Sequence, residues 1–309
     1  MKKYILGIDI GGTKCAVILG RSGETDSKII ERAAFPTIVE RGWQAVIDEL
    51  LKTADEVLEK NGVEAYEIGG IGISCGGPLD SKKGVIMCPP NLPDWDNVPI
   101  VKIFEKHFGV KTNLQNDANA CAVAEWKYGA GRGTQNCIFL TFGTGMGAGL
   151  ILDGRLYSGT NDMAGEVGHI RLAEDGPEGY GKKGSFEGFC SGGGIARLAD
   201  FTAGEKTGQT AKTLAENMYK GDVFAADVYK KCAEKLGAGL SVLIDILNPE
   251  VIVIGSIYAR NTEFFDSIIL PVIKREALEN SASVCRIVPA ELGEQIGDFA
   301  ALGLAEMED

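Results

Sequence analysis

Two short glycine-rich segments contain the residues best suited to binding phosphate. The first holds Asp9, Gly11, Gly12, Thr13 and Lys14, and the second holds Gly143, Thr144 and Gly145. Glycine lets the backbone approach a phosphate closely, and successive N–H groups in a tight turn form a concave anion site. Asp9 could hold Mg²⁺, directly or through water, because this cation prefers oxygen ligands. A plain hairpin turn would explain either segment alone, but two such turns in equivalent places favour phosphate binding.

The two most common nucleotide-binding motifs do not account for these turns. A P-loop needs the pattern GxxxxGK[ST], which does not occur in the sequence. A dinucleotide-binding fingerprint needs GxGxxG at the start of a helix, whereas residues 143–149 read GTGMGAG. Both turns are followed by β-like apolar runs, CAVIL and AGLIL, so the folds that carry these two motifs are disfavoured.

The elements around the two turns repeat along the chain. Residues 4–19 and 137–152 each read as an apolar run, a glycine turn and a second apolar run, which indicates a duplicated domain. Further strands are expected at 68–74, 111–115 and 250–256, and helices at 41–61, 222–247, 262–279 and 297–307. Strands mixed with helices in this way predict an α/β protein with two similar lobes.

The segment between the two repeats contains a long loop and a helix start. Residues 75–99 are rich in Gly, Pro, Asn and Asp and read as a loop, and long loops in compact domains are often functional. Asp117 is expected to cap a helix that runs to about Tyr128. Taken alone, Asp117 would therefore be interpreted as a helix cap.

The composition argues against several classes of protein. The chain has 309 residues and a formal net charge of −12, and no cluster of Lys and Arg is longer than a pair, so no nucleic-acid partner is expected. No apolar segment is long enough for a transmembrane helix, so no membrane span is expected. The eight cysteines include no CxxC pair, which favours reduced thiols and a cytoplasmic protein.

Taken together and in order, the motifs resemble those of the ROK family of sugar kinases and sugar-responsive repressors, within the hexokinase–actin superfamily. The motifs are ILGIDIGGTK, GISCGGPLD (72–80), NLPDW (91–95), QNDANA (115–120), TFGTGMGAG, GEVGH (165–169) and VIVIGS. The resemblance covers nearly the whole chain. It implies two actin/hexokinase-like (ribonuclease H-like) lobes around a central cleft, with residues 1–117 plus 297–309 in the smaller lobe and residues 118–296 in the larger.

The resemblance also implies a role for each matching residue. Asp117 would be the general base that accepts the proton of a sugar hydroxyl, a role that capping a helix does not exclude. The residues expected at the sugar are Gly77, Asn91, Asn116, Asp117, Glu166, His169 and Glu187. The two glycine turns would bind the phosphates of ATP, with Mg²⁺ near Asp9, and Gly255 and Ser256 would flank the adenosine. His107 keeps the interpretation of an ordinary residue at a helix end.

One stretch departs from the family pattern. Many ROK proteins carry a zinc motif, H…CxCGxxGCxE, where this sequence reads EGYGKKGSFE (178–187). Glu178, Tyr180 and Ser185 stand in place of the three cysteines, and structural zinc sites depend on such thiolate ligands. The sequence therefore predicts no structural zinc, with His169 oriented by a hydrogen bond and Tyr180 supplying packing in place of the metal.

The resemblance implies a kinase that uses ATP and Mg²⁺ to phosphorylate a hexose, with the 6-hydroxyl of glucose as the leading acceptor. N-acetylmannosamine, N-acetylglucosamine, fructose and a β-glucoside are alternative substrates. A sugar-sensing repressor would need a DNA-binding extension, for which the few residues before Asp9 leave no room. A non-catalytic sugar-binding protein would have no need of Asp117 together with both phosphate turns. We expect the kinase to be a cytoplasmic homodimer.

Overall fold

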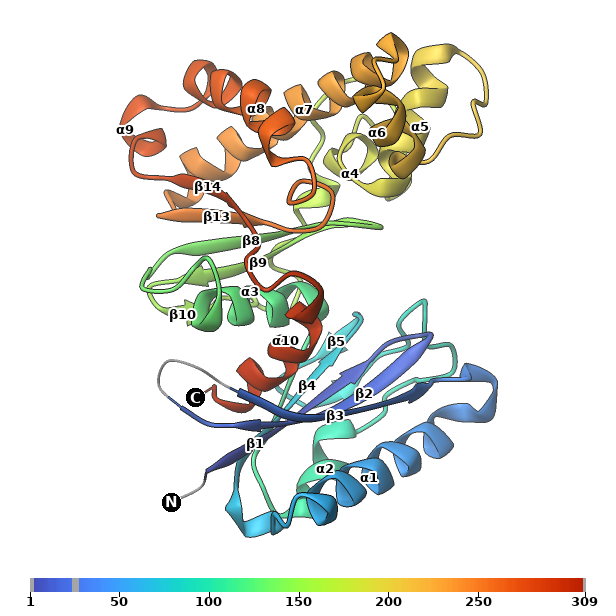
Figure 1. Cartoon of the computed structure of the whole chain (residues 1–309), viewed down its shortest axis with the longest axis vertical. Helices are drawn as coiled ribbons and strands as arrows, with labels where there is room; N and C mark the ends of the chain where they lie inside the picture. The colour runs from blue at the N-terminus through green and yellow to red at the C-terminus, as the bar shows by residue number, and fades with distance from the viewer. Residues whose placement is uncertain (1–2, 24–27, 308–309) are drawn as a thin grey trace. The chain divides into compact units, whose positions relative to one another are not determined.

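The computed structural model describes residues 3–23 and 28–307, and the chain divides into two compact units (Figure 1). Unit 1 contains the residues up to Gly133, Leu156–Ala164 and the residues from Glu291 onward, and unit 2 contains Thr134–Arg155 and Gly165–Ala290. Each unit is built on a five-stranded sheet. No helix in the described ranges is both long and apolar enough to cross a membrane.

The sheet of unit 1 has the strand order β3-β2-β1-β4-β7. Its strands are β1 (Tyr4–Ile10), β2 (Lys14–Arg21), β3 (Lys28–Pro36), β4 (Ile68–Cys75) and β7 (Thr112–Gln115). β1, β2 and β3 are antiparallel neighbours, whereas β4 and β7 run parallel to β1. The register pairs Asp9 with Ser74 and Ser74 with Gln115, so the three parallel strands end at the same edge of the sheet.

Helices cover both faces of this sheet. They are α1 (Gly42–Lys60), α2 (Ile100–Phe108), α3 (Asp117–Tyr128) and α10 (Ile296–Ala305). α1 and α2 share a core with Leu6 and Ile8 of β1, whereas α10 shares a core with Ile5 of β1 and Ile18 of β2. Because successive residues of a strand point to opposite faces, β1 supplies side chains to both cores. α3 packs beside α10.

α10 lies very close to the sheet because glycines line the groove beneath it. A Cβ atom at Gly72 would overlap the carbonyl oxygen of Ala301, and one at Gly70 would overlap that of Ala305. Gly7 is paired with Gly72 across the sheet, and a Cβ there would lie 2.9 Å from Ala301 Cβ. Any side chain in this groove would therefore push α10 away from β1 and β4.

The sheet of unit 2 repeats the arrangement of unit 1, with the order β10-β9-β8-β13-β14. Its strands are β8 (Cys137–Phe142), β9 (Met146–Leu152), β10 (Arg155–Leu156), β13 (Val251–Ile254) and β14 (Arg286–Pro289). As in unit 1, an antiparallel hairpin around a glycine turn is followed by two strands parallel to its first strand. The predicted α/β class with two similar halves is confirmed.

The helices of unit 2 are α4 (Phe186–Phe189), α5 (Gly192–Ala203), α6 (Ala211–Tyr219), α7 (Val223–Leu247), α8 (Thr262–Glu276) and α9 (Glu279–Ala282). The long helix α7 packs against α4, α5, α6 and α8. Two small hairpins complete the chain, β5 (Leu79–Asp80) with β6 (Val85–Ile86) in unit 1, and β11 (Glu178–Gly179) with β12 (Lys182–Lys183) in unit 2.

Two expectations about the elements differ from the structure. The loop predicted at 75–99 contains the short hairpin β5–β6, and the helix predicted at 262–279 ends at Glu276, because Ala277 is extended before α9 begins. The remaining predicted helices and strands are present, with bounds that shift by a few residues.

The grouping of residues into units also differs from the predicted lobes. α3 falls in unit 1 because it packs against α10, whereas the prediction ended the first part of the smaller lobe at residue 117. Leu156–Ala164 joins unit 1 because the Asp162 carboxylate accepts hydrogen bonds from Ser81 N at 2.8 Å and Ser81 Oγ at 2.7 Å.

The close packing at the glycine groove predicts that one added methyl group destabilises the fold of unit 1. We expect Gly72→Ala to lower the free energy of unfolding by about 1–3 kcal/mol or more, because the new methyl group overlaps the backbone of α10. Urea denaturation followed by circular dichroism measures this change. A variant within 0.5 kcal/mol of the wild type, which is the usual range for a neutral surface substitution, would contradict the close packing.

Candidate functional site

The first glycine turn joins β1 to β2 in unit 1. Gly11 N donates a hydrogen bond to Lys14 O at 3.1 Å, which closes the turn, and Thr37 Oγ1 donates to Gly11 O at 2.6 Å. A Cβ at Gly12 would lie 2.5 Å from the carbonyl oxygen of Asn91. Glycine is therefore required at position 12 by the neighbouring loop, independently of any ligand.

Four of the residues predicted to bind sugar lie together in unit 1. Asn91 Oδ1 is 3.1 Å from where a Cβ would lie at Gly76, and Asn116 Cβ is 4.0 Å from the equivalent position at Gly77. Asp117 follows Asn116 directly, at the start of α3. The loop after β4, the loop that carries Asn91 and the loop after β7 therefore meet beside the first glycine turn.

The cap of α3 is Asn116, and the expectation that Asp117 caps this helix was wrong. Asn116 has an extended backbone, and its Oδ1 accepts a hydrogen bond from Asn119 N at 2.9 Å, whereas Asp117 is the first helical residue. Both residue types are good caps, so the sequence pattern could not choose between adjacent positions. The capping bond uses the oxygen of Asn116 and leaves the Asp117 carboxylate free of that role.

The charges of two carboxylates from distant parts of unit 1 act on Asp9. Burial is the main cause that raises the pKa of Asp9 from 3.8 to about 6, and the negative charges of Asp117 and Asp298 raise it as well. Lys14 and Arg32 oppose this shift. Arg32 Nε donates to both oxygens of Asp298, at 2.8 and 3.0 Å. The result is a concentration of negative charge beside the first glycine turn.

The surroundings of Asp117 make its carboxylate more basic than that of an ordinary aspartate. Surrounding protein atoms reduce the hydration of its carboxylate and raise its pKa above the ordinary value of 3.8, while a hydrogen bond with Ser74 lowers it. Ser74 lies in β4, next to Asp9 in the sheet. The Asp117 residue is still reached by solvent, so a ligand can approach it.

The carboxylates fit Mg²⁺ only if the ion also has other ligands. Within residues 3–23 and 28–307, no group of three or more His, Cys, Asp or Glu side chains is arranged to hold a metal ion. Mg²⁺ commonly binds one or two carboxylates together with water and phosphate oxygens. Burial and, after it, the neighbouring carboxylates raise the pKa of Asp9, and a divalent cation there would stabilise the ionised form. These residues therefore suit an ion that is partly coordinated by a nucleotide.

The second glycine turn joins β8 to β9 in unit 2. Gly143 N donates to Gly145 O at 3.2 Å, and Gly192 N, at the start of α5, donates to Gly143 O at 2.7 Å. A Cβ at Gly143 would lie 3.4 Å from Ser256 Oγ, which is ordinary contact. The predicted adenosine-side residues Gly255 and Ser256 thus lie beside the second turn, where the parallel strands β8 and β13 end.

Glu187 lies beside the same turn. Its Oε2 accepts a hydrogen bond from Met146 N at 3.1 Å and would lie 3.0 Å from a Cβ at Gly145. A Cβ at Gly168, in the short 3₁₀ helix Val167–His169, would lie 3.3 Å from Glu187 Cβ. The GEVGH segment, Glu187 and the second turn are therefore neighbours in unit 2.

His169 is held by Lys182, which the sequence analysis did not single out. Lys182 Nζ lies 3.0 Å from His169 Nδ1 and donates to the backbone oxygen of His169 at 2.8 Å. The Tyr180 ring packs edge-on against the imidazole at 5.9 Å, and Tyr180 OH lies 3.3 Å from Glu166 Oε2, which is long for such a bond. Burial, followed by the charges of Glu166 and Glu187, raises the pKa of Tyr180, so the hydroxyl remains a donor.

The stretch aligned with the zinc motif is organised by hydrogen bonds. Tyr180 and Gly181 form the two-residue turn between β11 and β12, with φ values of 54° and 63°. Positive φ at both positions is typical of a tight hairpin turn. Ser185 is buried, donates to Gly179 O at 3.0 Å and caps α4 by accepting from Gly188 N at 3.1 Å. The absence of structural zinc stays a prediction.

Each unit contains some of the predicted sugar-binding residues. Gly77, Asn91, Asn116 and Asp117 belong to unit 1, and Glu166, His169 and Glu187 belong to unit 2. The sequence analysis missed Asp298, Lys182 and the glycines at the start of α5. Asp298 and Lys182 become notable only through contacts with residues far away in the sequence or across a hairpin. The run Gly192–Gly194 was a readable signal, because glycines at a helix start can lie close to another backbone.

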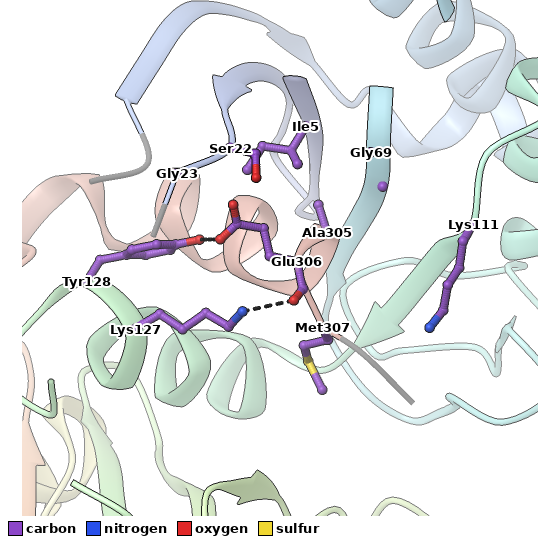
Figure 2. Close-up of a pocket in the computed structure, with 11 residues that line it drawn as sticks. Ile5, Ser22, Gly23, Gly69, Lys111, Lys127, Tyr128, Ala305, Glu306 and Met307 are labelled. Carbon is purple, nitrogen blue, oxygen red and sulfur yellow. Dashed lines mark hydrogen bonds between the residues drawn. The ribbon is translucent and has the colours of Figure 1, made fainter. Parts of the chain in front are cut away.

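Unit 1 also contains a hollow of about 740 Å³ that includes none of the predicted site residues (Figure 2). It is lined in part by Ser22, Lys111, Lys127, Tyr128 and Glu306. Two of these contacts hold the end of α10 against α3. Lys127 Nζ donates to Glu306 O at 3.0 Å, and Tyr128 OH donates to Glu306 Oε2 at 2.6 Å.

Comparisons with known proteins agree with the motifs and the fold. The ROK family profile matches residues 5–308. A glucokinase from Thermotoga maritima is 31% identical, with 98% of this chain and 97% of the relative covered. A xylose repressor from Caldicellulosiruptor bescii is 29% identical over 87% of this chain and 69% of the relative.

Solved structures give the same result. A ROK hexokinase from Thermus thermophilus superimposes with a TM-score of 0.84 at 30% identity, covering 98% of this chain and 97% of that one. A ROK family glucokinase from Streptomyces griseus, solved in complex with glucose and AMPPNP, gives a TM-score of 0.72 at 28% identity, covering 98% of this chain and 99% of that one. Because the family profile spans almost the entire chain, this protein belongs to the ROK family.

Proposed function

We propose that this ROK protein is an ATP-dependent sugar kinase that phosphorylates a hexose, with Asp117 as the general base and the 6-hydroxyl of glucose as the leading acceptor. Kinases are among its relatives of nearly equal length, which supports the enzyme class. The observation that carries the proposal is the Asp117 carboxylate, which is reached by solvent, has a raised pKa and is not used as the helix cap.

Asp117 supplies the chemistry that a sugar hydroxyl needs. A neutral hydroxyl is a poor nucleophile, and a positioned carboxylate both orients it and accepts its proton as the phosphoryl group moves. The raised pKa makes the Asp117 carboxylate a better proton acceptor than that of an ordinary aspartate. Ser74 restrains the carboxylate by a hydrogen bond.

The hydrogen bonds already made by the site residues limit what each can offer a sugar. The Oδ1 of Asn116 is used by Asn119 N, so its Nδ2 group is left to donate. Glu187 Oε2 accepts from Met146 N, which leaves Oε1 to accept from a hydroxyl. Glu166 has one oxygen near Tyr180 and can accept through the other. Carboxylate acceptors and amide donors are both groups that can bind the hydroxyls of a hexose.

The two glycine turns and Asp9 are proposed to bind the phosphates of ATP with Mg²⁺. The ion, when bound, neutralises charge on the β- and γ-phosphate oxygens. Asp9 would hold it directly or through water. Gly255 and Ser256 are proposed to contact the adenosine, because they lie beside the second turn. A cytoplasmic location and a homodimer remain predictions from the sequence.

The first test examines both the ATP-dependent turnover of a sugar and the role of Asp117 as the general base. Wild-type protein should consume ATP in the presence of one hexose from a panel of glucose, N-acetylmannosamine, N-acetylglucosamine, fructose and a β-glucoside, and NMR of the product locates the phosphate. Asp117→Asn should lower kcat by about 10²–10⁴-fold with sugar binding retained, because the general base is lost. Asp48→Asn, an exposed residue of α1, is the control. Wild-type turnover in folded Asp117→Asn would remove Asp117 from the mechanism.

The second test concerns the phosphate turn of unit 2. A methyl group at Gly143 meets only Ser256 at ordinary contact distance, so Gly143→Ala should fold normally. The same methyl should obstruct a phosphate and raise the KM for ATP by about tenfold or more, with the sugar KM little changed. Steady-state kinetics with each substrate varied gives both values. Equal increases in both KM values would argue against a phosphate role for this turn.

The third test uses the pKa of Asp9. Because the folded protein raises this pKa from 3.8 to about 6, ionised Asp9 destabilises the fold above pH 6, and this cost disappears as the pH falls towards 4. Asp9→Asn should therefore raise the free energy of unfolding at pH 7.5 by about 1–3 kcal/mol, allowing for partial solvent screening, and by little at pH 4.

The same variant should lose most ATP turnover at any Mg²⁺ concentration that saturates the wild type. Urea denaturation at the two pH values and an ATPase-coupled assay provide the measurements, again with Asp48→Asn as the control. A less stable Asp9→Asn protein at pH 7.5 would show that Asp9 is a structural residue, and full activity would exclude it from the metal site.

A further inference from the structure

The contact between Lys182 and His169 fixes the position of a proton. A lysine ammonium has three donor hydrogens and no acceptor. Lys182 Nζ lies 3.0 Å from His169 Nδ1, so Nδ1 must be the acceptor and the neutral imidazole must carry its hydrogen on Nε2. The second ring nitrogen of His169 is then a hydrogen-bond donor.

The same ammonium also fixes the direction of the ring. Lys182 Nζ donates to the backbone oxygen of His169 at 2.8 Å, so one side chain holds both the imidazole and the peptide that carries it. The Tyr180 ring packs edge-on against the imidazole, at an interplanar angle of 85°. Lys182 and Tyr180 both belong to the β11–β12 hairpin, whose turn is closed by Tyr180 and Gly181.

We propose that Lys182 is a positioning residue that holds His169 as an Nε2–H donor to an oxygen of the sugar. The inference rests on the proposed function, since it assigns a role within the same sugar site. The need for an Nε2–H donor follows from the neighbours of His169 in unit 2. Glu166 and Glu187 are acceptors when ionised, so among these three side chains only His169 can donate to a hydroxyl or carbonyl oxygen of the substrate.

The state of the imidazole is tested by NMR without any substrate. The chain contains two histidines, so long-range ¹H–¹⁵N spectra of the rings hold only two patterns. His107 serves as the internal reference, because its Nε2 lies 2.9 Å from Asp55 Oδ2 and must carry a hydrogen to bond this carboxylate. At pH 8, His169 in the wild type should show a protonated Nε2 and an unprotonated Nδ1.

Three substitutions of Lys182 test whether this residue determines which nitrogen of His169 carries the hydrogen. Lys182→Glu puts an acceptor beside Nδ1 and should move the hydrogen to that nitrogen, Lys182→Met should leave the two forms in exchange, and Lys182→Arg should keep the wild-type pattern. Lys183→Met is the matched control, since successive strand residues point to opposite faces and Lys183 is exposed. An unchanged His107 pattern shows that unit 1 is folded, and a circular dichroism spectrum like that of the wild type shows the same for the whole chain of each variant. Identical His169 patterns in all variants would overturn the proposal.

Kinetics then test the role in sugar binding. Lys182→Met should raise the sugar KM by roughly 2- to 12-fold, the effect expected when one ordinary hydrogen bond between exposed side chains is lost, with the KM for ATP unchanged. Lys182→Arg and Lys183→Met should stay close to the wild type. A normal sugar KM in Lys182→Met would overturn the sugar role. If no sugar is turned over by the wild type, the proposed function fails, while the NMR pattern still decides whether Lys182 sets the imidazole.

Discussion

The accumulation of negative charge beside the first glycine turn is the constraint on which unit 1 depends. Asp9, Asp117 and Asp298 come from β1, the start of α3 and the first turn of α10, and their repulsion contributes to the raised pKa of Asp9. The fold compensates in part, through Arg32 on Asp298 and through the positive N-terminal ends of α3 and α10. A cation at this position would stabilise the ionised carboxylates further, in keeping with the proposed function. Sites of this kind commonly trade stability for activity.

The two units share a topology but differ in what they place at equivalent positions. In unit 1 the glycine turn is crowded by the loop of Asn91, and the surrounding side chains are carboxylates and amides. In unit 2 the turn has space at Gly143, and its neighbours include Ser256, Glu187 and the start of α5. The two units have therefore diverged, with the proposed base in unit 1 and a lysine-held imidazole in unit 2.

The sequence predicted the elements whose local patterns are strong, and it missed shorter ones such as α2, α5 and α6. Apolar runs on both sides of each glycine turn are sufficient to predict β1–β2 and β8–β9, and a long apolar stripe predicts α7. Among the strands it missed, β3 and β14 are edge strands, in which much of the surface faces solvent and the apolar pattern is weak. The choice between Asn116 and Asp117 as the cap depends on which of the two residues has an extended backbone, and a sequence pattern does not resolve this. Asp298 and Lys182 could not be predicted, since their importance lies in contacts made only after folding.

The glycine groove under α10 sets an order for folding during synthesis. α10 packs on β1 and β4, yet the ribosome makes it after every residue of unit 2. Unit 2 can therefore complete its core while the groove formed by Gly7, Gly70 and Gly72 is still uncovered, and one face of the first sheet remains open until residues 296–305 emerge. Nascent chains generally fold domain by domain from the N-terminus, and uncovered apolar surface favours aggregation. In this protein the synthesis of unit 1 starts first, but its fold is completed last. Its sheet needs protection from aggregation until α10 has been synthesised.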